Sequence, residues 1–379
     1  MKKSYYSLGL MSGTSMDGVD ASIIQSDGET KYKVIIDKYF EYPAGIFQDL
    51  TKLRYKIKSS KDLKKFSKEV KNIEKEITLF HAKAVKQILE KTKVNVDFVG
   101  FHGQTIYHNA KEKISVQLGD GKLLSKTTKK TVIYNFRQND LKNGGGGAPL
   151  ASIFHKLIVS QNKIRHPILI LNLGGIANWT LLGKTDDGKD LHSADVGPGN
   201  CLIDQWMRKN SKQNYDKDGS IAKLGNVNKT ILNIGIDNYI QLILKESSNP
   251  LINFNKDRSY DVKDFDISFV HGLSLEDGAA TLTEYTSFII SEVINAMHDV
   301  RRVVVCGGGR KNKFLLKKIS KKLKYSIQPI DNFGIDGDFI ESQAFAYLAI
   351  RSYLKLPISF PNTTGVSKPC TGGVIVKNY

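Results

Sequence analysis

The sequence predicts an α/β protein built from two related domains with a cleft between them. Segments with the character of strands alternate with segments of helical character along the chain. Two similar units, each an apolar strand, a glycine-rich turn and a second strand, begin near Tyr5 and at Pro167. The length of 379 residues also exceeds what one hydrophobic core usually serves.

The first part of the chain is expected to form one sheet and one long helix. Apolar residues recur at helical spacing over Lys61–Lys91, which predicts a single helix there. The run NGGGGAPL (Asn143–Leu150) contains four glycines and is predicted to be a loop or hinge. Strands are expected at Tyr5–Leu10, Val19–Gln25, Lys31–Phe40, Val96–Phe101, Ser115–Leu118 and Thr131–Tyr134.

The second part repeats the strand–turn–strand plan and then adds helices. PILILNLGGIANWTLLG, which begins at Pro167, predicts two strands joined by a glycine turn. RRVVVCGGGRKNKFLLKKI, which begins at Arg301, predicts a strand, a glycine turn and a helix. Helical segments are also expected at Gly197–Met207, Tyr285–His298 and Glu341–Leu354.

Composition favours a globular protein of the cytoplasm. No run approaches the roughly 20 apolar residues that a membrane span needs, and the start lacks the apolar region of a signal peptide. The net charge of +18 comes from scattered lysines, so a solvated basic surface is favoured over a nucleic-acid-binding one. A basic rim that attracts an anionic ligand is a second possibility. Cys201, Cys306 and Cys370 lie too far apart to indicate a disulfide framework or a zinc site.

Three glycine turns follow apolar strands, and they are the principal candidates for phosphate binding. They are GTSMDG (Gly13–Gly18), NLGGIAN (Asn172–Asn178) and CGGGRKN (Cys306–Asn312). Glycine lets backbone N–H groups approach an anion closely. One such turn is weak support, because hairpins often need glycine, but three together favour a nucleotide. No GxxxxGK[ST] motif is present, which argues against a P-loop site.

Carboxylates near two of these turns suggest acid–base or metal chemistry. Asp17 lies in the first turn, where a carboxylate beside phosphate needs a cation between them, so it is a candidate Mg²⁺ ligand through water. The alternative is an Asx turn with its own backbone. Asp195 precedes GPGN at the end of a short strand and is a candidate general base. Its alternative role is a turn or helix-cap carboxylate.

Further polar residues could contact a sugar. Arg137 could clamp a carboxylate, or form an interdomain ion pair. Glu341 opens the last helix, where the helix dipole alone favours an acidic residue. Gln104 and Thr105, which follow the Val96–Phe101 strand, suit hydrogen bonding to a sugar or amide. His102 lies beside them and is a further candidate, with a structural role as its alternative.

Together, the motifs of this sequence resemble those of a known family. GLMSGTSMDGVDA, GFHGQTIYH, NFRQNDLKNGGGGAPL, LNLGGIANWT, DVGPGN, ATLTEYT, VCGGGRKN, GIDGDFIESQAFAYLA and LPISFPNTTGV occur in the order found in the anhydro-N-acetylmuramic acid kinases. The resemblance covers nearly the whole chain. It implies two actin/hexokinase-like (ribonuclease H-like) domains of the sugar kinase/Hsp70/actin superfamily, with ATP and substrate in the cleft between them.

The resemblance also implies roles for individual residues. Domain one would span residues 1–135 plus a C-terminal helical part, about 341–379, and domain two 136–340. Asp195 would be the catalytic base, with Glu341 assisting, and Asp17 would act on Mg²⁺. ATP would contact Gly13, Thr14, Ser15, Met16, Asp17, Gly18, Val19, Asp20, Asn172, Gly174, Gly175, Gly307, Gly308 and Gly309. Substrate would contact His102, Gln104, Thr105, Arg137, Asp140, Gly197 and Asn200.

The reaction implied is ATP-dependent and consumes water. Water would open the 1,6-anhydro ring of 1,6-anhydro-N-acetylmuramic acid while ATP phosphorylates O6, in peptidoglycan recycling. A cytoplasmic homodimer is expected from the family. The alternatives are another sugar or sugar-acid kinase of the superfamily, an Hsp70- or actin-like ATPase, and a nucleic-acid binder.

Some positions depart from the family pattern. Asn135 stands where the family usually has Asp, Gly146 where it has Gln, and Val196 where it has Thr. Residues 247–265 only partly match a family segment, with Lys256, Arg258 and Ser259 as its remnants. These departures bear on substrate contacts rather than on the ATP site.

Overall fold

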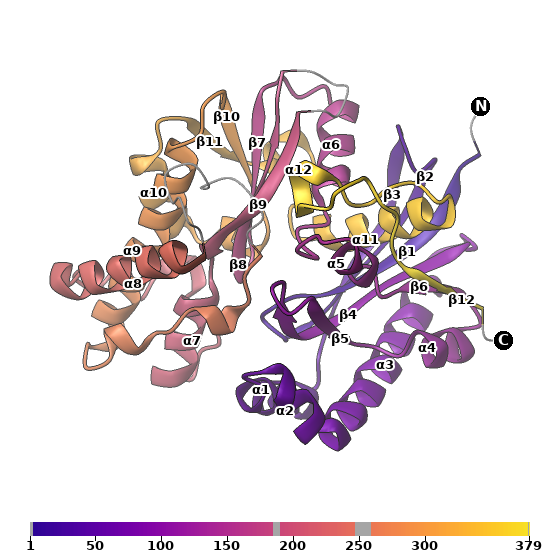
Figure 1. Ribbon diagram of the computed structural model, residues 1–379, viewed down its shortest axis with the longest axis horizontal. Helices are drawn as coiled ribbons and strands as arrows, with labels where there is room; N and C mark the ends of the chain where they lie inside the picture. Colours follow the sequence, from indigo (N-terminus) through magenta and orange to yellow (C-terminus); the bar gives the residue numbers. More distant parts are fainter. Residues whose placement is uncertain (1–2, 185–189, 247–258, 378) are drawn as a thin grey trace. The chain divides into compact units, whose positions relative to one another are not determined.

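The computed structural model describes residues 3–184, 190–246, 259–377 and 379. The chain forms two compact units. Unit 1 contains Met1–Ile164 and Phe339–Tyr379, and unit 2 contains Arg165–Asp338, so unit 2 is inserted between two segments of unit 1 (Figure 1).

Unit 1 is a mixed sheet with helices on both faces. Its strand order is β12-β6-β4-β1-β2-β3, and β5 pairs with β4. Strands β1, β2 and β3 are antiparallel neighbours, whereas β1, β4 and β6 are parallel. The elements are β1 (Tyr5–Ser12), β2 (Gly18–Ser26), β3 (Tyr32–Glu41), α1 (Ala44–Lys56), α2 (Ser60–Lys65), α3 (Ser67–Leu89), β4 (Phe98–Asn109), β5 (Ile114–Leu118), α4 (Gly121–Thr128), β6 (Thr131–Tyr134), α5 (Gln138–Lys142), α6 (Ser152–Gln161), α11 (Ile340–Tyr353), α12 (Pro361–Thr364) and β12 (Val374–Val376).

Unit 2 has a five-stranded sheet of order β11-β10-β7-β8-β9. Here β7, β8 and β9 are antiparallel neighbours, and β7, β10 and β11 are parallel. The elements are β7 (Ile168–Leu173), β8 (Ile176–Leu182), β9 (Leu191–Pro198), α7 (Cys201–Asn210), η1 (Lys217–Gly219), α8 (Lys229–Glu246), η2 (Val262–Asp264), η3 (Ser268–Val270), α9 (Leu275–Asn295), β10 (Arg302–Cys306), η4 (Gly308–Lys311), α10 (Lys313–Lys322), β11 (Ser326–Pro329) and η5 (Ile330–Phe333).

The same strand plan occurs in both units. β3-β2-β1-β4-β6 in unit 1 corresponds to β9-β8-β7-β10-β11 in unit 2, in order and in direction. Helix α3 precedes β4 just as α9 precedes β10. The predicted α/β class with two related domains is therefore confirmed.

Alternation along the strands divides unit 1 into two apolar layers. Leu8 and Leu10 of β1 belong to the cluster that contains Ile77 and Val85 of α3. On the other face Gly9 lies against α11, where an added Cβ would come within 1.9 Å of the Ser342 carbonyl oxygen. The helix therefore approaches the backbone of β1 directly. Figure 1 shows α3 and α4 on one side of these strands and α11 on the other.

The domain boundary differs from the predicted one. Residues 136–164 belong to unit 1 rather than to the second domain. Phe136 and Leu150 pack in one apolar cluster with Phe345 of α11. The Gly146 N–H also donates to the Thr364 carbonyl oxygen at 2.7 Å. These contacts hold the segment after β6 on the first sheet.

Several predicted helices have other limits. The helix predicted over Lys61–Lys91 is two helices, α2 and α3, because Phe66 between them leaves the helical backbone conformation (φ −102°, ψ 23°). The helix predicted at Tyr285–His298 begins ten residues earlier, where Ser274 caps α9 by accepting the Asp277 N–H at 3.1 Å. The segment Gly197–Met207 begins as strand β9 and becomes helix α7 only at Cys201.

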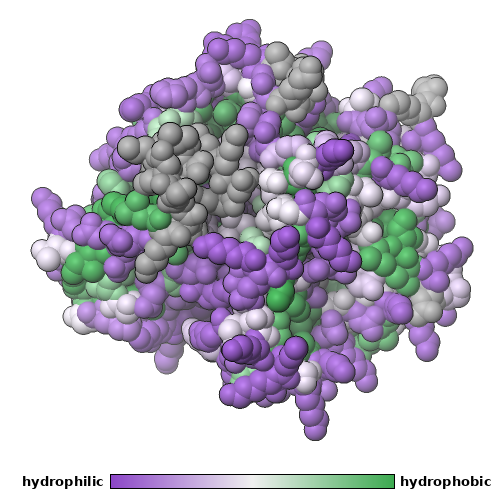
Figure 2. Space-filling model, viewed as in Figure 1, coloured by the Kyte–Doolittle hydropathy of each residue, from purple (hydrophilic) through white to green (hydrophobic). Residues whose placement is uncertain are grey.

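One face of the molecule can be described by its hydropathy. Figure 2 shows that, on the face drawn, hydrophilic residues predominate and hydrophobic ones form separate patches. None of the helices within the described residues has the length and apolar character needed to cross a lipid bilayer.

Candidate active site

The first glycine turn connects β1 to β2 in unit 1. The Met16 N–H donates to the Gly13 carbonyl oxygen at 3.2 Å, and Met16 adopts a left-handed backbone conformation (φ 60°). The Ser15 hydroxyl donates to Asp17 Oδ1 at 2.5 Å, and the Asp17 side chain is exposed. A Cβ added to Gly13 would meet nothing closer than Ser15 Oγ at 3.8 Å. The turn thus combines hydroxyl groups, an exposed carboxylate and open space beside its backbone.

Not every residue predicted at this turn lies on its surface. Met16 and Val19 are buried in the apolar cluster of unit 1. Gly18 lies under the Tyr39 ring, which an added Cβ would approach to 2.6 Å. Asp20 lies within β2, opposite Tyr39 of β3. Gly13, Thr14, Ser15 and Asp17 are therefore the residues of this turn that remain partly or fully exposed.

Gln104 lies beside the first turn at a register shift between β1 and β4. Its side chain is fully buried, and its Nε2 donates to the Gly13 carbonyl oxygen at 2.9 Å. Its Oε1 has no hydrogen-bond partner among the described residues. A buried amide oxygen in this position suits a ligand donor. Thr105 instead accepts from Gln117 of β5 at 3.2 Å.

His102 and Arg137 form a buried polar contact near Glu341. Arg137 donates to His102 Nε2 through NH2 at 2.9 Å and to the Gly147 carbonyl oxygen through NH1 at 2.7 Å. Burial and the Arg137 charge lower the pKa of His102 well below its usual value, so the imidazole is neutral and accepts. Burial raises the pKa of Glu341, although Arg137 opposes that shift. The structure thus brings these three predicted residues into one electrostatic group.

Asp140 anchors the glycine loop. It is 1% exposed, and its carboxylate accepts the Gly147 N–H at 2.6 Å and the Thr364 hydroxyl at 2.5 Å. An added Cβ on Gly145 would come within 2.2 Å of Asp140 Oδ1. The predicted loop at 143–150 is confirmed as irregular backbone, and Asp140 fixes its conformation.

In unit 2 the β7–β8 turn and the start of α7 fit closely together. The N–H groups of Gly199 and Asn200 donate to the carbonyl oxygens of Gly175 and Gly174, both at 2.9 Å. An added Cβ on Gly199 would come within 2.2 Å of the Gly174 carbonyl oxygen. Asn200 Nδ2 also donates to the Leu173 carbonyl oxygen at 3.3 Å. Asn200 therefore joins the two turns.

Asp195 lies in β9, two residues before Gly197. Its side chain is 7% exposed, and its Oδ2 accepts the Tyr260 N–H at 2.8 Å. The neighbouring Val196 carbonyl oxygen accepts the Tyr239 hydroxyl at 2.6 Å. Asp195 is thus a buried carboxylate that a backbone N–H holds in place, close in sequence to the glycines of GPGN.

The third glycine turn follows β10, next to the β7–β8 turn. An added Cβ on Gly307 would come within 2.4 Å of Asn172 Oδ1, and one on Gly309 within 2.7 Å of Asn200 Nδ2. A Cβ on Gly308 would meet nothing within 4 Å. The turn is therefore packed on the protein side and open at Gly308, where a flat group could lie on bare backbone.

Sequence comparison identifies the family. The family described as anhydro-N-acetylmuramic acid kinase matches residues 5–378. The chain belongs to the anhydro-N-acetylmuramic acid kinase family. The anhydro-N-acetylmuramic acid kinase of Pelagibacter ubique is 55% identical over 386 aligned positions, covering 100% of both chains. That of Zymomonas mobilis is 37% identical and covers 97% of this chain and 98% of the relative.

The solved structures that align with this chain are less similar to it in sequence than these relatives are. An activator of 2-hydroxyisocaproyl-CoA dehydratase from Clostridium difficile aligns with a TM-score of 0.45 and 13% identity, over 91% of this chain and 94% of that one. A ROK family glucokinase from Streptomyces griseus aligns with a TM-score of 0.40 and 10% identity, over 91% and 99% of the two chains.

One cluster of charged side chains in this anhydro-N-acetylmuramic acid kinase family member was not predicted from its sequence. Arg310 of the CGGGRKN motif contacts three aspartates that lie 21 to 28 residues further along the chain: Asp331, Asp336 and Asp338. The only local signal was the GIDGD motif, which carries two of them. Of the family-segment remnants, Lys256 and Arg258 lie outside the described residues, and Ser259 lies just inside them.

Proposed function

We propose that this protein opens the 1,6-anhydro ring of 1,6-anhydro-N-acetylmuramic acid with water and transfers the γ-phosphoryl group of ATP to O6. The products would be N-acetylmuramic acid 6-phosphate and ADP, within peptidoglycan recycling. Membership of the anhydro-N-acetylmuramic acid kinase family supports the substrate and the reaction. The observation that carries the mechanism is the buried Asp195 carboxylate beside the glycine turns of unit 2.

Asp195 would act as the general base. It would take a proton from the water whose oxygen bonds to C1 of the sugar. The bond between C1 and O6 would break, and O6 would bond to the γ-phosphorus as the bond from that phosphorus to the bridging β,γ-oxygen breaks. The Tyr260 N–H on Oδ2 would hold the carboxylate in one orientation. Such positioning converts a bimolecular encounter into an effectively intramolecular step.

The remaining polar groups would position the ligands. The turn at Gly13–Asp17 and the turns at Gly174 and Gly307–Gly309 would bind ATP. Arg137, held by neutral His102, would attract the lactyl carboxylate of the substrate. Gln104 Oε1 would accept from a sugar hydroxyl or amide. Glu341, whose pKa is raised by burial, would help to orient the water.

The residues present fit an indirect Mg²⁺ site. No three His, Cys, Asp or Glu side chains gather as a direct metal site in the part of the chain that the structure describes. Asp17, exposed at the phosphate turn with Ser15 on one oxygen, suits a contact through water. When bound, Mg²⁺ would neutralise charge on the β- and γ-phosphate oxygens.

The test is product analysis in ¹⁸O-labelled water with Mg·ATP and the anhydro-sugar. Wild-type protein should give a 6-phosphate with ¹⁸O at C1, and Asp195→Asn should lower kcat by about 10²- to 10⁴-fold. Asp216→Asn is the matched control. Asp216 is also a buried carboxylate of unit 2 that accepts backbone N–H groups, from Ile221 and Ala222 at 2.9 Å.

The outcomes separate substrate from mechanism. If ATP is consumed only with an ordinary hexose and no ¹⁸O enters the sugar, the substrate proposal is wrong. If Asp195→Asn keeps wild-type kcat, Asp195 is not the base. The Asp216 variant should lose stability while its kcat stays within about twofold, since it alters no ligand contact.

A further inference from the structure

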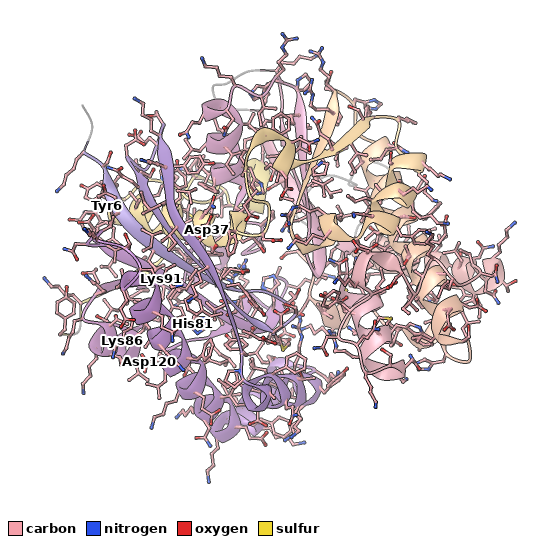
Figure 3. The ribbon with its side chains drawn as sticks, turned by 180° about the vertical axis from the view of Figure 1, so that it is seen from behind. Tyr6, Asp37, His81, Lys86, Lys91 and Asp120 are labelled. Atoms are coloured by element: carbon pink, nitrogen blue, oxygen red, sulfur yellow. The ribbon has the colours of Figure 1, made fainter. Side chains whose placement is uncertain are left out.

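A chain of buried hydrogen bonds lies directly beneath the first glycine turn. Ser12 is the last residue of β1 and immediately precedes Gly13. Ser12 is 1% exposed, and its hydroxyl lies 2.8 Å from the Tyr42 hydroxyl and 3.2 Å from His81 Nε2. His81 comes from α3, and Figure 3 shows it where that helix passes the strands of the sheet. Three elements therefore meet at the Ser12 hydroxyl.

The hydrogen bonds among Tyr42, Ser12 and His81 allow only one assignment of donors and acceptors. His81 Nδ1 lies 2.8 Å from the Ile77 carbonyl oxygen, which can only accept, so Nδ1 carries a proton. His81 is fully buried, and burial lowers its pKa to about 4, so the ring is neutral and Nε2 is an acceptor. The Ser12 hydroxyl must then donate to Nε2, and the Tyr42 hydroxyl must donate to Ser12.

Tyr42 also holds the other end of the turn. It directly follows β3, and its backbone N–H donates to the Asp17 carbonyl oxygen at 2.8 Å. Its ring is 4% exposed and packs edge-on against Phe80 of α3, with centroids 4.9 Å apart. One rigid residue thus bonds to Ser12 before the turn and to Asp17 at its end.

The carbonyl oxygens of the turn are engaged by protein donors. Gln104 Nε2 donates to the Gly13 oxygen at 2.9 Å, and Arg54 NH1 lies 3.5 Å from the Thr14 oxygen. The Asp17 oxygen accepts from Tyr42. Carbonyl oxygens repel phosphate, whereas backbone N–H groups attract it. Fixing the carbonyls on the protein side orients the turn for an anion.

We propose that Tyr42, Ser12 and His81 are positioning residues that hold the first glycine turn in the conformation that binds the nucleotide phosphates. This inference rests on the proposed function, which assigns phosphate binding to that turn. The three side chains act through the backbone and touch no ligand. Their loss weakens nucleotide binding because the turn must then be ordered when the nucleotide binds.

The experiment compares Tyr42→Phe and Ser12→Ala with Ser22→Ala. Ser22 is a matched control, since it is fully buried in the adjacent strand β2 and its hydroxyl lies 2.6 Å from that of Ser342 on α11. The dissociation constant for Mg·ADP is measured by titration calorimetry, KM for ATP and for the sugar by steady-state kinetics, and stability by thermal unfolding. All three variants should lose stability to a similar degree.

Only the variants of Tyr42 and Ser12 should weaken nucleotide binding. Tyr42→Phe and Ser12→Ala should each raise the Mg·ADP dissociation constant and KM for ATP by about 5- to 20-fold, with KM for the sugar within about twofold. The double variant should bind Mg·ADP about as tightly as the single variant with the lower affinity, because Tyr42 acts through Ser12. Ser22→Ala should bind Mg·ADP as the wild type does. Wild-type affinity in both Tyr42→Phe and Ser12→Ala would overturn the inference.

A fourth variant separates this inference from the proposed function. Gly13→Ala adds a Cβ into open space on the turn, so it should leave stability unchanged and weaken Mg·ADP binding. If Gly13→Ala binds Mg·ADP normally, the turn is not the phosphate site and the proposed assignment fails. If Gly13→Ala weakens binding and the Tyr42 and Ser12 variants do not, only the positioning role fails.

Discussion

Arg310 donates two parallel hydrogen bonds to Asp331, from Nε at 2.7 Å and from NH2 at 2.8 Å. Its NH1 donates to Asp338 at 2.5 Å and to the Gly307 carbonyl oxygen at 3.3 Å. The Arg310 side chain is 6% exposed. Burial alone would lower the pKa of Arg310, but Asp331 and Asp338 raise it. One guanidinium therefore joins the third glycine turn to the segment before α11.

Replacing Arg310 should destabilise unit 2 and weaken ATP binding. Arg310→Ala should lower the free energy of unfolding by about 2 kcal/mol, because the hydrogen bonds and packing of the buried guanidinium are lost, whereas the carboxylates of Asp331 and Asp338, 45% and 29% exposed, stay in contact with water. Arg310→Lys should cost about half as much and still raise KM for ATP, since an ammonium group cannot reproduce the two parallel bonds. Urea unfolding measures the first effect and steady-state kinetics the second.

The control is an exposed ion pair of similar length. Lys56 Nζ lies 2.7 Å from Glu69, with side chains 44% and 45% exposed. Lys56→Ala should change the free energy of unfolding by less than about 1 kcal/mol. An Arg310→Ala variant no less stable than Lys56→Ala would contradict the role assigned to Arg310.

Stability should fall on mild acidification, because the unfolded state protonates two histidines that stay neutral in the folded protein. Burial lowers the pKa of His81 and of His155 to about 4, from an ordinary value of 6.5. Between those values the unfolded state binds more protons than the folded state, so stability rises with pH and is lost as pH falls below about 6.5. At pH 5.5 each histidine should lower the free energy of unfolding by about 1 kcal/mol relative to neutral pH.

Thermal unfolding between pH 7.5 and 5 measures this dependence. His155→Gln should reduce the slope, because glutamine does not titrate, although the variant will be less stable at every pH. A slope unchanged by His155→Gln would show that His155 does not contribute. Asp27, whose pKa is about 2, acts in a lower range. Burial opposes that shift, while hydrogen bonds from Thr30 and nearby backbone N–H groups produce it. Its contribution is lost only below about pH 4.

Alanine substitution of two adjacent glycines in the third turn should affect different properties: ligand binding for Gly308 and stability for Gly309. Gly308→Ala adds a Cβ that meets nothing within 4 Å, so the free energy of unfolding should change by less than about 0.5 kcal/mol. Binding of Mg·ATP should nevertheless weaken if the nucleoside lies on this backbone. Gly309→Ala forces a Cβ to within 2.8 Å of Leu173 Cβ and should cost about 2 kcal/mol. Thermal unfolding and calorimetric titration distinguish the two effects.

Asp140 should behave as a structural residue rather than a substrate ligand. Asp140→Asn places an N–H₂ group or a weaker acceptor against the Gly147 N–H, which should cost about 2 kcal/mol. Thr364→Val removes the second partner, and the double variant should cost less than the sum. KM for the sugar, measured below the unfolding transition, should change by less than about threefold for Thr364→Val. A large KM effect without loss of stability would instead favour direct substrate contact.

The strands and glycine turns could be predicted from the sequence, because their signals are local. β1, β7 and β10 are apolar runs that are each followed directly by a glycine, so a turn is expected after each of them. The pairing of two strand–turn–strand units led to the correct class. The long-range strand order was accessible only through the family resemblance.

The ends of helices, and the hydrogen bonds between residues far apart in the sequence, were harder to predict. The break at Phe66 lies within an uninterrupted apolar periodicity, so spacing alone predicts one helix. The hydrogen bond between Asp140 and Thr364, which lies 224 residues further along the chain, could not be predicted from local sequence. Arg310 and the Tyr42–Ser12–His81 chain were missed for the same reason. Side-chain hydrogen bonds between distant segments leave no periodic trace.

The insertion of unit 2 within unit 1 has a consequence for synthesis on the ribosome. Unit 2 is one continuous segment, so it can fold once residue 338 has emerged. Unit 1 cannot complete its sheet packing until α11 arrives, because Gly9 of β1 and Gly100 of β4 lie directly against that helix. The part of the chain made first is therefore the part that folds last, and its exposed apolar strands must wait for the C-terminal segment.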